Sequence, residues 1–381
     1  METTISHPRL PSEILDDIVD FLHDDSEALH RCCLVLKPWI SRTRKHLFAD
    51  IKFQSDNDLD SWKKTFPDPM NSPARHTRTL TIECDPGDTG EGSWIQSFSS
   101  VERLVVNYTW AIIDITHLRA PVPFYTFAPS LKSLLITALL LPDSQILDFV
   151  RSLLVLEDLT LICDGVIDAD ASNRPTITST SPPLTGSLEL FVSDGLAWIL
   201  RPLVELPGGL RFRKLELAWC CELDLSLVME LVTACSDTLE CLDIGCEIYG
   251  TLGSVPMLPS RLLAPPYTDE LEPGTIDLSK TTRLKDVVFR CPSESLDSRW
   301  IIMMLETITS NHQDLRQISI HVPFTPDSTR DLRPIEQVEV ANPGMLWLDL
   351  DRLLVQIWEL HSIHSTVVCL QSVNRTMLVD Y

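Results

Sequence analysis

A short apolar pattern returns along most of this chain and limits the ways in which it can fold. In each copy, two residues separate the first and second apolar positions and one residue separates the second and third, as in Leu131, Leu134 and Ile136. Alternating apolar residues indicate a strand with one buried face, and recurrence at mostly 20 to 31 residues predicts a repeat protein. The middle residues of the copies stand at positions 51, 80, 104, 134, 159, 188, 215, 242, 287, 318 and 338, and the copies at 80 and 188 lack the first apolar residue.

Amphipathic stretches fill several of the intervals between the predicted strands. Apolar residues recur at helical spacing in Ser144–Leu156, Leu225–Cys235 and Leu296–Ile308, so we expect a helix in each stretch. A strand followed by a helix, repeated, predicts a parallel sheet whose units bury their apolar faces against their neighbours. We expect Met345–Trp358 to be a capping helix, followed by a last strand near Val367–Val368.

The strand pattern resembles that of the leucine-rich repeat family. This resemblance implies an α/β solenoid, an irregular leucine-rich-repeat-like horseshoe, over residues 49–381. Two stretches depart from the pattern: residues 164–183 are rich in Asp, Ser, Thr and Pro, and residues 250–275 are rich in proline. We expect both to be long loops.

A different pattern occupies residues 10–48 and overlaps the first strand at Phe48. Leu10–Leu22 carries apolar residues at helical spacing, with acidic residues mostly on the opposite side. A second helix is predicted within Ala28–Trp39, and Pro38 ends it and begins a third, because the residue before a proline avoids helical angles. Three helices of about forty residues together cannot bury much apolar surface, so their apolar faces need a partner.

The order of these residues resembles the F-box, the module that joins a protein to a SKP–cullin–F-box ubiquitin ligase. The resemblance implies that residues 10–48 bind a SKP-type adaptor, and a cullin through it. The overlap of the two patterns at Phe48 indicates that no flexible linker follows and that this module packs directly on the first repeat. The positions that match adaptor-facing positions, or that set that face, are Leu10, Pro11, Ile14, Leu15, Leu34 and Trp39.

Two alternatives stay open within this N-terminal region. Residues such as Ile18 and Phe21 either join the adaptor contact or hold the three helices together, and the sequence does not divide the two sets. The apolar stripe itself either binds an adaptor or docks on the rest of the chain. We expect residues 1–9 to be a disordered N-terminus.

The charge and hydropathy of the chain exclude several kinds of partner. The formal net charge is −23, from 31 basic and 54 acidic residues, which argues against binding nucleic acid or anionic membranes through a basic surface. The longest apolar run, Leu134–Leu141, is too short to span a bilayer, and no secretory signal precedes it at the N-terminus. We therefore expect a cytoplasmic or nuclear protein.

The cysteines raise the question of a zinc site, because five of the 11 fall between Cys220 and Cys246. Their spacing does not give the two close pairs that zinc usually requires. Four cysteines instead stand four residues after the middle apolar residue of their strand and are expected to point inward as small hydrophobes, without a metal. These four are Cys84, Cys163, Cys246 and Cys291.

No catalytic pattern is visible. Gly87–Gly92 lacks the Lys-Ser/Thr of a phosphate loop, His361 and His364 have no surrounding zinc motif, and there is no nucleophile elbow. The dense basic cluster between Lys37 and His46 is interpreted as a solvated helix face. No cofactor and no enzymatic activity are expected of this chain.

The outward-pointing residue is acidic in three successive predicted strands: Glu189, Glu216 and Asp243. Adjacent strands lie about 4.8 Å apart, so these side chains are expected to form a ladder on the concave face. Like charges placed opposite one another destabilise a sheet by roughly 0.2–1 kcal/mol a pair. We hypothesise that the ladder recognises a Lys/Arg-rich segment of a protein target; the alternative is coincidence in an acidic chain.

Together the two resemblances imply a substrate-recognition subunit of an E3 ubiquitin ligase. The F-box would bind the adaptor, and the repeats would hold an unknown protein target near a conjugating enzyme, so that catalysis by proximity uses the chemistry of other subunits. One alternative is an F-box scaffold that binds the adaptor without promoting degradation, and an enzyme built on the repeats is a third.

Overall fold

The structure is a computed structural model, and the part of the chain that it describes consists of residues 11–35, 37–68, 71–83, 92–108, 127–142, 149–167, 183–192, 196–206, 208–219, 225–246, 276–290, 299–324, 347–361, 365–372 and 375–380. The chain divides into two compact units. The first contains Met1–Leu139 and Phe149–Leu156, and the second contains Leu140–Asp148 and Glu157–Tyr381. The predicted disordered N-terminus, the predicted strand around Val338 and the predicted loop 250–275 lie outside the described residues.

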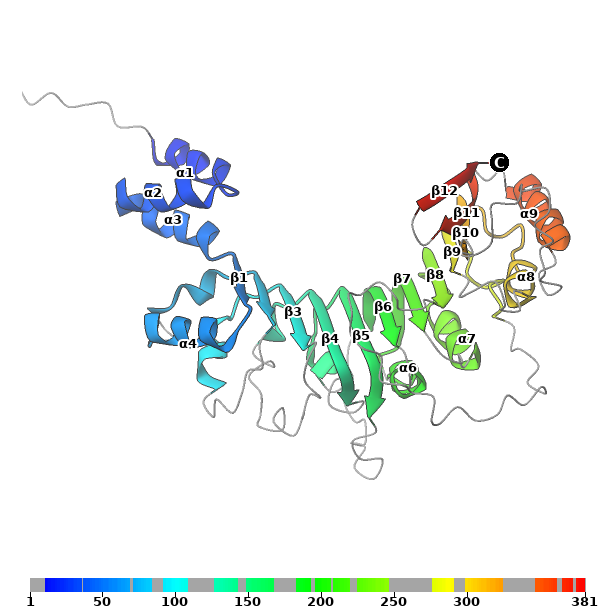
Figure 1. Ribbon diagram of the computed structural model, residues 1–381, viewed down its shortest axis with the longest axis horizontal. Helices are drawn as coiled ribbons and strands as arrows, with labels where there is room; N and C mark the ends of the chain where they lie inside the picture. The colour runs from blue at the N-terminus through cyan, green and yellow to red at the C-terminus, as the bar shows by residue number, and fades with distance from the viewer. Residues whose placement is uncertain are drawn as a thin grey trace, which may run out of the picture. The chain divides into compact units, whose positions relative to one another are not determined.

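Both units are α/β, and within each unit the strands lie beside one another in chain order (Figure 1). The described pairings are parallel, except that the last strand is antiparallel to the one before it. The strands of the first unit are β1 Asp50–Phe53, β2 Thr79–Ile82, β3 Arg103–Tyr108 and β4 Ser133–Pro142. Those of the second are β5 Asp158–Ile167, β6 Leu184–Val192, β7 Leu210–Trp219, β8 Cys241–Cys246, β9 Asp286–Arg290, β10 Gln317–Phe324, β11 Ser365–Ser372 and β12 Arg375–Asp380.

The predicted apolar pattern sets the register of both units. The middle residue of one copy pairs with the middle residue of the next, as Leu80 pairs with Leu104 in the first unit and Leu215 with Leu242 in the second. The middle residues of the described strands are all buried, since Ile51 is 9% exposed and the others are 0–1% exposed. The prediction of a parallel α/β sheet is therefore confirmed, with the apolar pattern facing the core.

The same backbone contact joins successive strands in both units. The carbonyl oxygen of Ala49 accepts hydrogen bonds from the N–H groups of Arg78 and Thr79, at 2.7 and 2.9 Å. In the second unit the carbonyl oxygen of Glu240 accepts from Lys285 and Asp286, at 2.7 and 3.1 Å. A carbonyl oxygen has two lone pairs and can accept two hydrogen bonds. The carbonyl of the residue just before one strand therefore fixes the first residues of the next strand beside it.

Helices pack on one side of the second unit's strands. Helices α6 (Leu196–Val204) and α7 (Leu225–Ala234) pack against each other and against β7, while α8 (Arg299–Leu305) packs against α9 (Trp347–His361) (Figure 1). The predicted helices near 225, 296 and 345 are thus present, although α8 is shorter than Leu296–Ile308. Helix α6 was not predicted, and Pro202 lies inside it.

An aromatic cluster forms the core of the first unit. Helix α4 (Asp56–Thr65) begins with a capping box in which the side chains of Ser55 and Asp58 bond reciprocally to the backbone. Its Trp62 packs edge-on against Phe53 of β1, at 5.8 Å between ring centroids, and against Phe98, at 5.7 Å. The short 3₁₀ helices η2 (Pro73–His76) and η3 (Gly92–Ser97) complete this unit.

Three short helices precede the first strand, as expected: α1 (Ser12–Phe21), α2 (Ser26–Val35) and α3 (Lys37–Leu47). We call residues 12–47 the three-helix module. The module joins the sheet without a linker, because Phe48 follows α3 directly and packs at 6.1 Å against Trp62 and against Phe66. The chain therefore packs directly on the first repeat at this point, as predicted, with Phe48 against α4 and α3 against η2.

One predicted loop needs correction. Residues 164–167 were expected to begin a long loop, but β5 continues through Ile167, and only residues 168–182 of that stretch lie outside the described residues. The helix predicted in Ser144–Leu156 is seen only as a helical segment at residues 149–152, where Val150 is buried.

Candidate functional site

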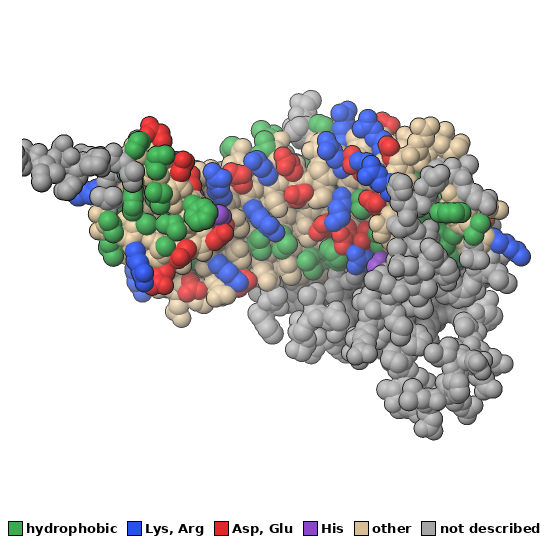
Figure 2. Space-filling model, turned by 90° about the horizontal axis from the view of Figure 1, so that it is seen from above, with side chains coloured by type: hydrophobic (Ala, Val, Ile, Leu, Met, Phe, Trp, Pro, Cys, Tyr) green, Lys and Arg blue, Asp and Glu red, His purple; other side chains and the backbone are tan. Residues whose placement is uncertain are grey.

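Five large apolar side chains of the three-helix module are exposed, and we call them the apolar helical surface. Along α1, Ile14 is 46% exposed, Ile18 41% and Phe21 86%; at the end of α2, Leu34 is 88% exposed and Val35 67%. Ile14, Ile18 and Phe21 are three and four residues apart, so they lie along one face of α1. Figure 2 shows hydrophobic side chains gathered on the module.

The module exposes these residues because its own core is small. Val19 and Leu29 are its fully buried apolar residues in the described part of the chain, together with Thr43, whose hydroxyl donates to the carbonyl of Trp39 at 2.6 Å. An isolated exposed leucine is ordinary on a protein surface, but three exposed apolar residues along one face of a helix are not.

The structure places the predicted adaptor residues as follows. Ile14 and Leu34 belong to the apolar helical surface, Pro11 is exposed, and Leu15 and Trp39 are half-buried. The indole N–H of Trp39 is buried and meets no hydrogen-bond acceptor in the described residues. Leu10 lies outside the described residues.

Of the two residues whose role the sequence left open, Phe21 is 86% exposed and Ile18 is 41% exposed, so Phe21 contributes little to packing among the three helices. A polar contact adds to the small core of the module: the Asp20 carboxylate accepts hydrogen bonds from Arg42 Nε at 2.7 Å and from Arg42 Nη2, and lies 2.8 Å from His46 Nε2.

This contact, the Asp20 clasp, joins α1 to α3. The hydrogen bonds from Arg42 and then from His46 hold the pKa of the Asp20 carboxyl well below its usual range. The same hydrogen bond raises the pKa of Arg42 above its ordinary value. Arg42 and His46 belong to the basic cluster that was predicted to be a solvated helix face. They instead hold α1 against α3.

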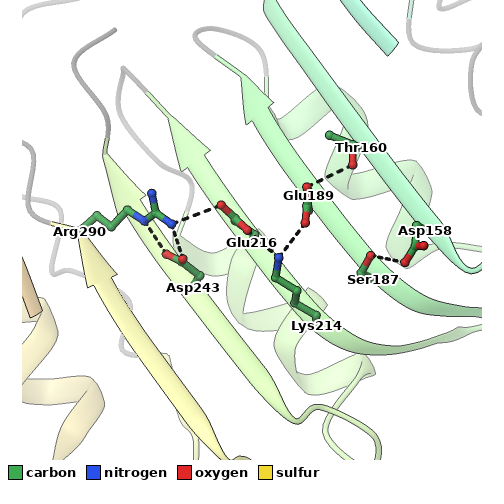
Figure 3. Close-up of polar contacts among 8 residues, drawn as sticks. All are labelled: Asp158, Thr160, Ser187, Glu189, Lys214, Glu216, Asp243 and Arg290. Atoms are coloured by element: carbon green, nitrogen blue, oxygen red, sulfur yellow. Dashed lines mark hydrogen bonds and ion pairs between the residues drawn. The ribbon is translucent and has the colours of Figure 1, made fainter. Parts of the chain in front are cut away.

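The second candidate site is on the sheet face of the second unit. The register pairs Glu189 with Glu216 and Glu216 with Asp243, so the three predicted acidic residues are lateral neighbours. Figure 3 shows that two cations lie between them. Lys214 Nζ is 2.7 Å from Glu189 and 2.8 Å from Glu216, and Arg290 contacts Asp243 at 2.6 Å and Glu216 at 3.3 Å.

This set of three acids and two cations, which we call the charged network, buries its acids more deeply than its cations. The side chains of Asp243, Glu216 and Glu189 are 9%, 15% and 27% exposed, whereas those of Arg290 and Lys214 are 33% and 39% exposed. Burial lowers the pKa of Lys214, but its hydrogen bonds to Glu189 and Glu216 outweigh burial and raise that pKa above its ordinary value.

Gly245 makes room for the arginine of this network. Arg290 lies beside Gly245 in the register and reaches back over β8 to Asp243. A Cβ atom on Gly245 would lie 2.2 Å from the Cβ of Arg290, which is closer than two carbon atoms can approach. The absence of a side chain at position 245 therefore allows the guanidinium to cross the strand.

Sequence reasoning found the acids of the charged network and missed its cations. Lys214 could have been predicted, because it stands two residues before Glu216 and so faces the same side of β7. The contact of Arg290 was harder to predict, because 45 residues separate the middle residues of β8 and β9. Asp158 and Asp286 lie on the same face of the sheet; Figure 2 shows acidic and basic side chains mixed over these strands.

The cysteine prediction can be followed only in part. Cys163 is 3% exposed in β5, as expected for an inward-facing residue. The side chain of Cys246 and the residues Cys84 and Cys291 lie outside the described part. Burial raises the pKa of the thiols of Cys235 and Cys241 to about 11.

The described residues contain no group of three His, Cys, Asp or Glu side chains placed to hold a metal ion. Within the same residues, no helix combines the length and the apolar character needed to cross a membrane. Neither models of known protein families nor curated protein sequences give a significant match to this chain.

Proposed function

We propose that this chain is the substrate-recognition subunit of a SKP–cullin–F-box ubiquitin ligase. In this proposal the three-helix module is an F-box that binds a SKP-type adaptor. The strands and helices from residue 49 onward form an irregular leucine-rich-repeat-like solenoid that binds a protein target. The chain itself supplies no catalytic group, and it acts by bringing the target close to a conjugating enzyme.

The observation that carries this proposal is the apolar helical surface. Ile14 and Leu34, which match adaptor-facing positions of the F-box, are 46% and 88% exposed. Protein interfaces gain most of their binding energy from a few apolar or aromatic anchors that become fully buried. The direct packing of Phe48 on α4 further suggests that an adaptor bound to the module would be held close to the first strands.

The repeated backbone contact supports the solenoid part of the proposal. Repeat proteins stack similar units so that each contacts its neighbours, and their sheet faces present a row of side chains to partners. The charged network itself has three carboxylates and two cations. We therefore keep Glu189, Glu216 and Asp243 as the proposed contact for a Lys/Arg-rich segment of the target, which would share these acids with Lys214 and Arg290.

Adaptor binding tests the first part of the proposal. A double change, Ile14→Ser with Leu34→Ser, should weaken capture of the full chain by a purified SKP-type adaptor by at least about tenfold, since each buried anchor contributes more than about 1 kcal/mol. The matched control is Leu154→Ser, which removes a leucine that is 64% exposed in the same unit but outside the module. Equal affinity in the double variant and the control would reject the F-box assignment.

In vitro ubiquitination then separates a receptor from a scaffold. A receptor assembled with adaptor, cullin and conjugating enzyme should transfer ubiquitin to proteins captured by residues 49–381. Adaptor binding without transfer would favour the non-degradative scaffold.

The target contact has its own test. The triple change Glu189→Gln, Glu216→Gln and Asp243→Asn should weaken target capture and flatten its dependence on salt. Unchanged capture with unchanged salt dependence would reject the network as the target contact.

A further inference from the structure

A group of three cations in the first unit has no ion pair within the described part of the chain, although the chain is strongly acidic. Arg44 and Lys45 are exposed in the last turn of α3, and Arg75 is exposed in η2, which packs against α3. In the described residues no carboxylate lies within ion-pair distance of any of the three. We call these three residues the basic patch.

His76 shows that the three cations are close together. Arg75 Nε lies 3.4 Å from His76 Nε2, and the ring of His76 is half-buried. Burial first, and then the positive charges of Arg75, Lys45 and Arg44, lower the pKa of His76. The fold therefore brings Arg44 and Lys45 close to Arg75, about thirty residues later in the sequence, and all three act on the imidazole of His76.

Two nearby cations are neutralised, unlike those of the patch. Arg42, two residues before Arg44, is paired with Asp20, and Lys52 of β1 is paired with Glu83 at 2.8 Å. The dipole of α3 favours cations in its last turn, which accounts for Arg44 and Lys45 but not for Arg75. Gathering three like charges without a carboxylate is unfavourable unless an anion joins them.

We propose that the basic patch binds an acidic segment of a partner polypeptide. Three cations match a short run of Asp or Glu side chains. A nucleic-acid interface typically neutralises about six to ten phosphates, and the net charge of −23 opposes a long polyanion. The patch shares no residue with the apolar helical surface or the charged network, so this inference does not depend on the proposed function.

A fluorescent decaglutamate peptide tests the proposal on the full chain. We expect the peptide to bind, with affinity that falls as salt rises. The triple change Arg44→Gln, Lys45→Gln and Arg75→Gln should weaken binding by roughly threefold to a hundredfold, as expected when three exposed charge contacts are lost together.

Two further variants separate a local effect from a general one. The control triple Lys64→Gln, Arg201→Gln and Lys280→Gln removes the same charge from exposed cations outside the patch and should leave binding unchanged. Arg44→Lys with Arg75→Lys keeps the charge and should keep binding.

Three results would overturn the proposal. The first is no binding of the peptide by the unchanged chain, and the second is equal weakening in the control triple. The third is tighter, patch-dependent binding of a ten-nucleotide single-stranded RNA, which would assign the patch to nucleic acid instead.

Discussion

The three-helix module and the strands that follow it use the same kinds of residue in opposite ways. Phe21 of α1 is 86% exposed, whereas Phe98, in the aromatic cluster of the same unit, is 0% exposed. Leu34 of α2 is 88% exposed, whereas Leu104 of β3 is 0% exposed. Each strand is covered by neighbours that repeat its apolar pattern, while the module has only its own small core.

Polar contacts also differ between the sheet and the three-helix module. On the sheet, the charged network joins β6, β7, β8 and β9 through contacts between neighbouring strands. In the module, the Asp20 clasp adds to the small apolar core formed by Val19 and Leu29. An apolar side chain is therefore buried in one region and exposed in the other, according to what lies beside it.

The largest expected difference between the two regions is in stability. Phe98→Ala should lower the free energy of unfolding by roughly 3–5 kcal/mol, because it leaves a cavity among Phe53, Trp62 and Trp94. Phe21→Ala should change it by less than about 0.5 kcal/mol, because Phe21 is mostly exposed. Urea denaturation measures the free energy of unfolding of both variants. Similar losses of free energy would show that Phe21 is a core residue and that the two regions do not differ in this way.

A smaller effect is expected from Gly245→Ala. The new methyl group would collide with the Cβ of Arg290 and displace its guanidinium from Asp243, lowering stability by roughly 1–3 kcal/mol, as overpacking usually does. The decisive control is a double-mutant cycle with Arg290→Gly, which removes the Cβ atom that the new methyl group would meet, so the two losses should be less than additive. Additive losses would mean that Gly245 does not act through Arg290.

The smallest effect is expected at the Asp20 clasp and depends on pH. The pKa of Asp20 is depressed in the folded chain, so the clasp stabilises the module fully above the ordinary carboxyl pKa of about 3.9 and loses this contribution as pH falls below it. Asp20→Asn should remove this dependence. Circular dichroism between pH 6 and pH 2 measures the helicity of the unchanged chain and of the Asp20→Asn variant. Loss of helicity over the same pH range in both proteins would show that the clasp does not stabilise the module.

The sequence predicted the strands well because their apolar spacing also fixes their register. The same spacing correctly predicted that Glu189, Glu216 and Asp243 are lateral neighbours on adjacent strands. It did not predict Arg290 beside Asp243, because the register of the strands says nothing of how far a long side chain reaches.

Two helices escaped prediction, and the exposure of two apolar residues was left open, for other physical reasons. Helix α6 contains Pro202, which usually ends a helix. Helix α4 is mostly polar, although the spacing of Ser55 and Asp58 is that of a capping box and was a readable signal. The exposure of Ile18 and Phe21 was not predictable, because helical periodicity shows that residues share a face but not what covers that face.

Titration calorimetry of the full chain with a purified SKP-type adaptor, repeated at several temperatures, tests the central claim most directly. If the apolar helical surface is the adaptor-binding surface, binding should show a clearly negative heat-capacity change, which reports burial of apolar area. Phe21→Ser with Leu34→Ser should abolish binding or make that change markedly smaller. The claim would be contradicted if no binding were detected, or if the double variant bound with the same affinity and the same heat-capacity change as the unchanged chain.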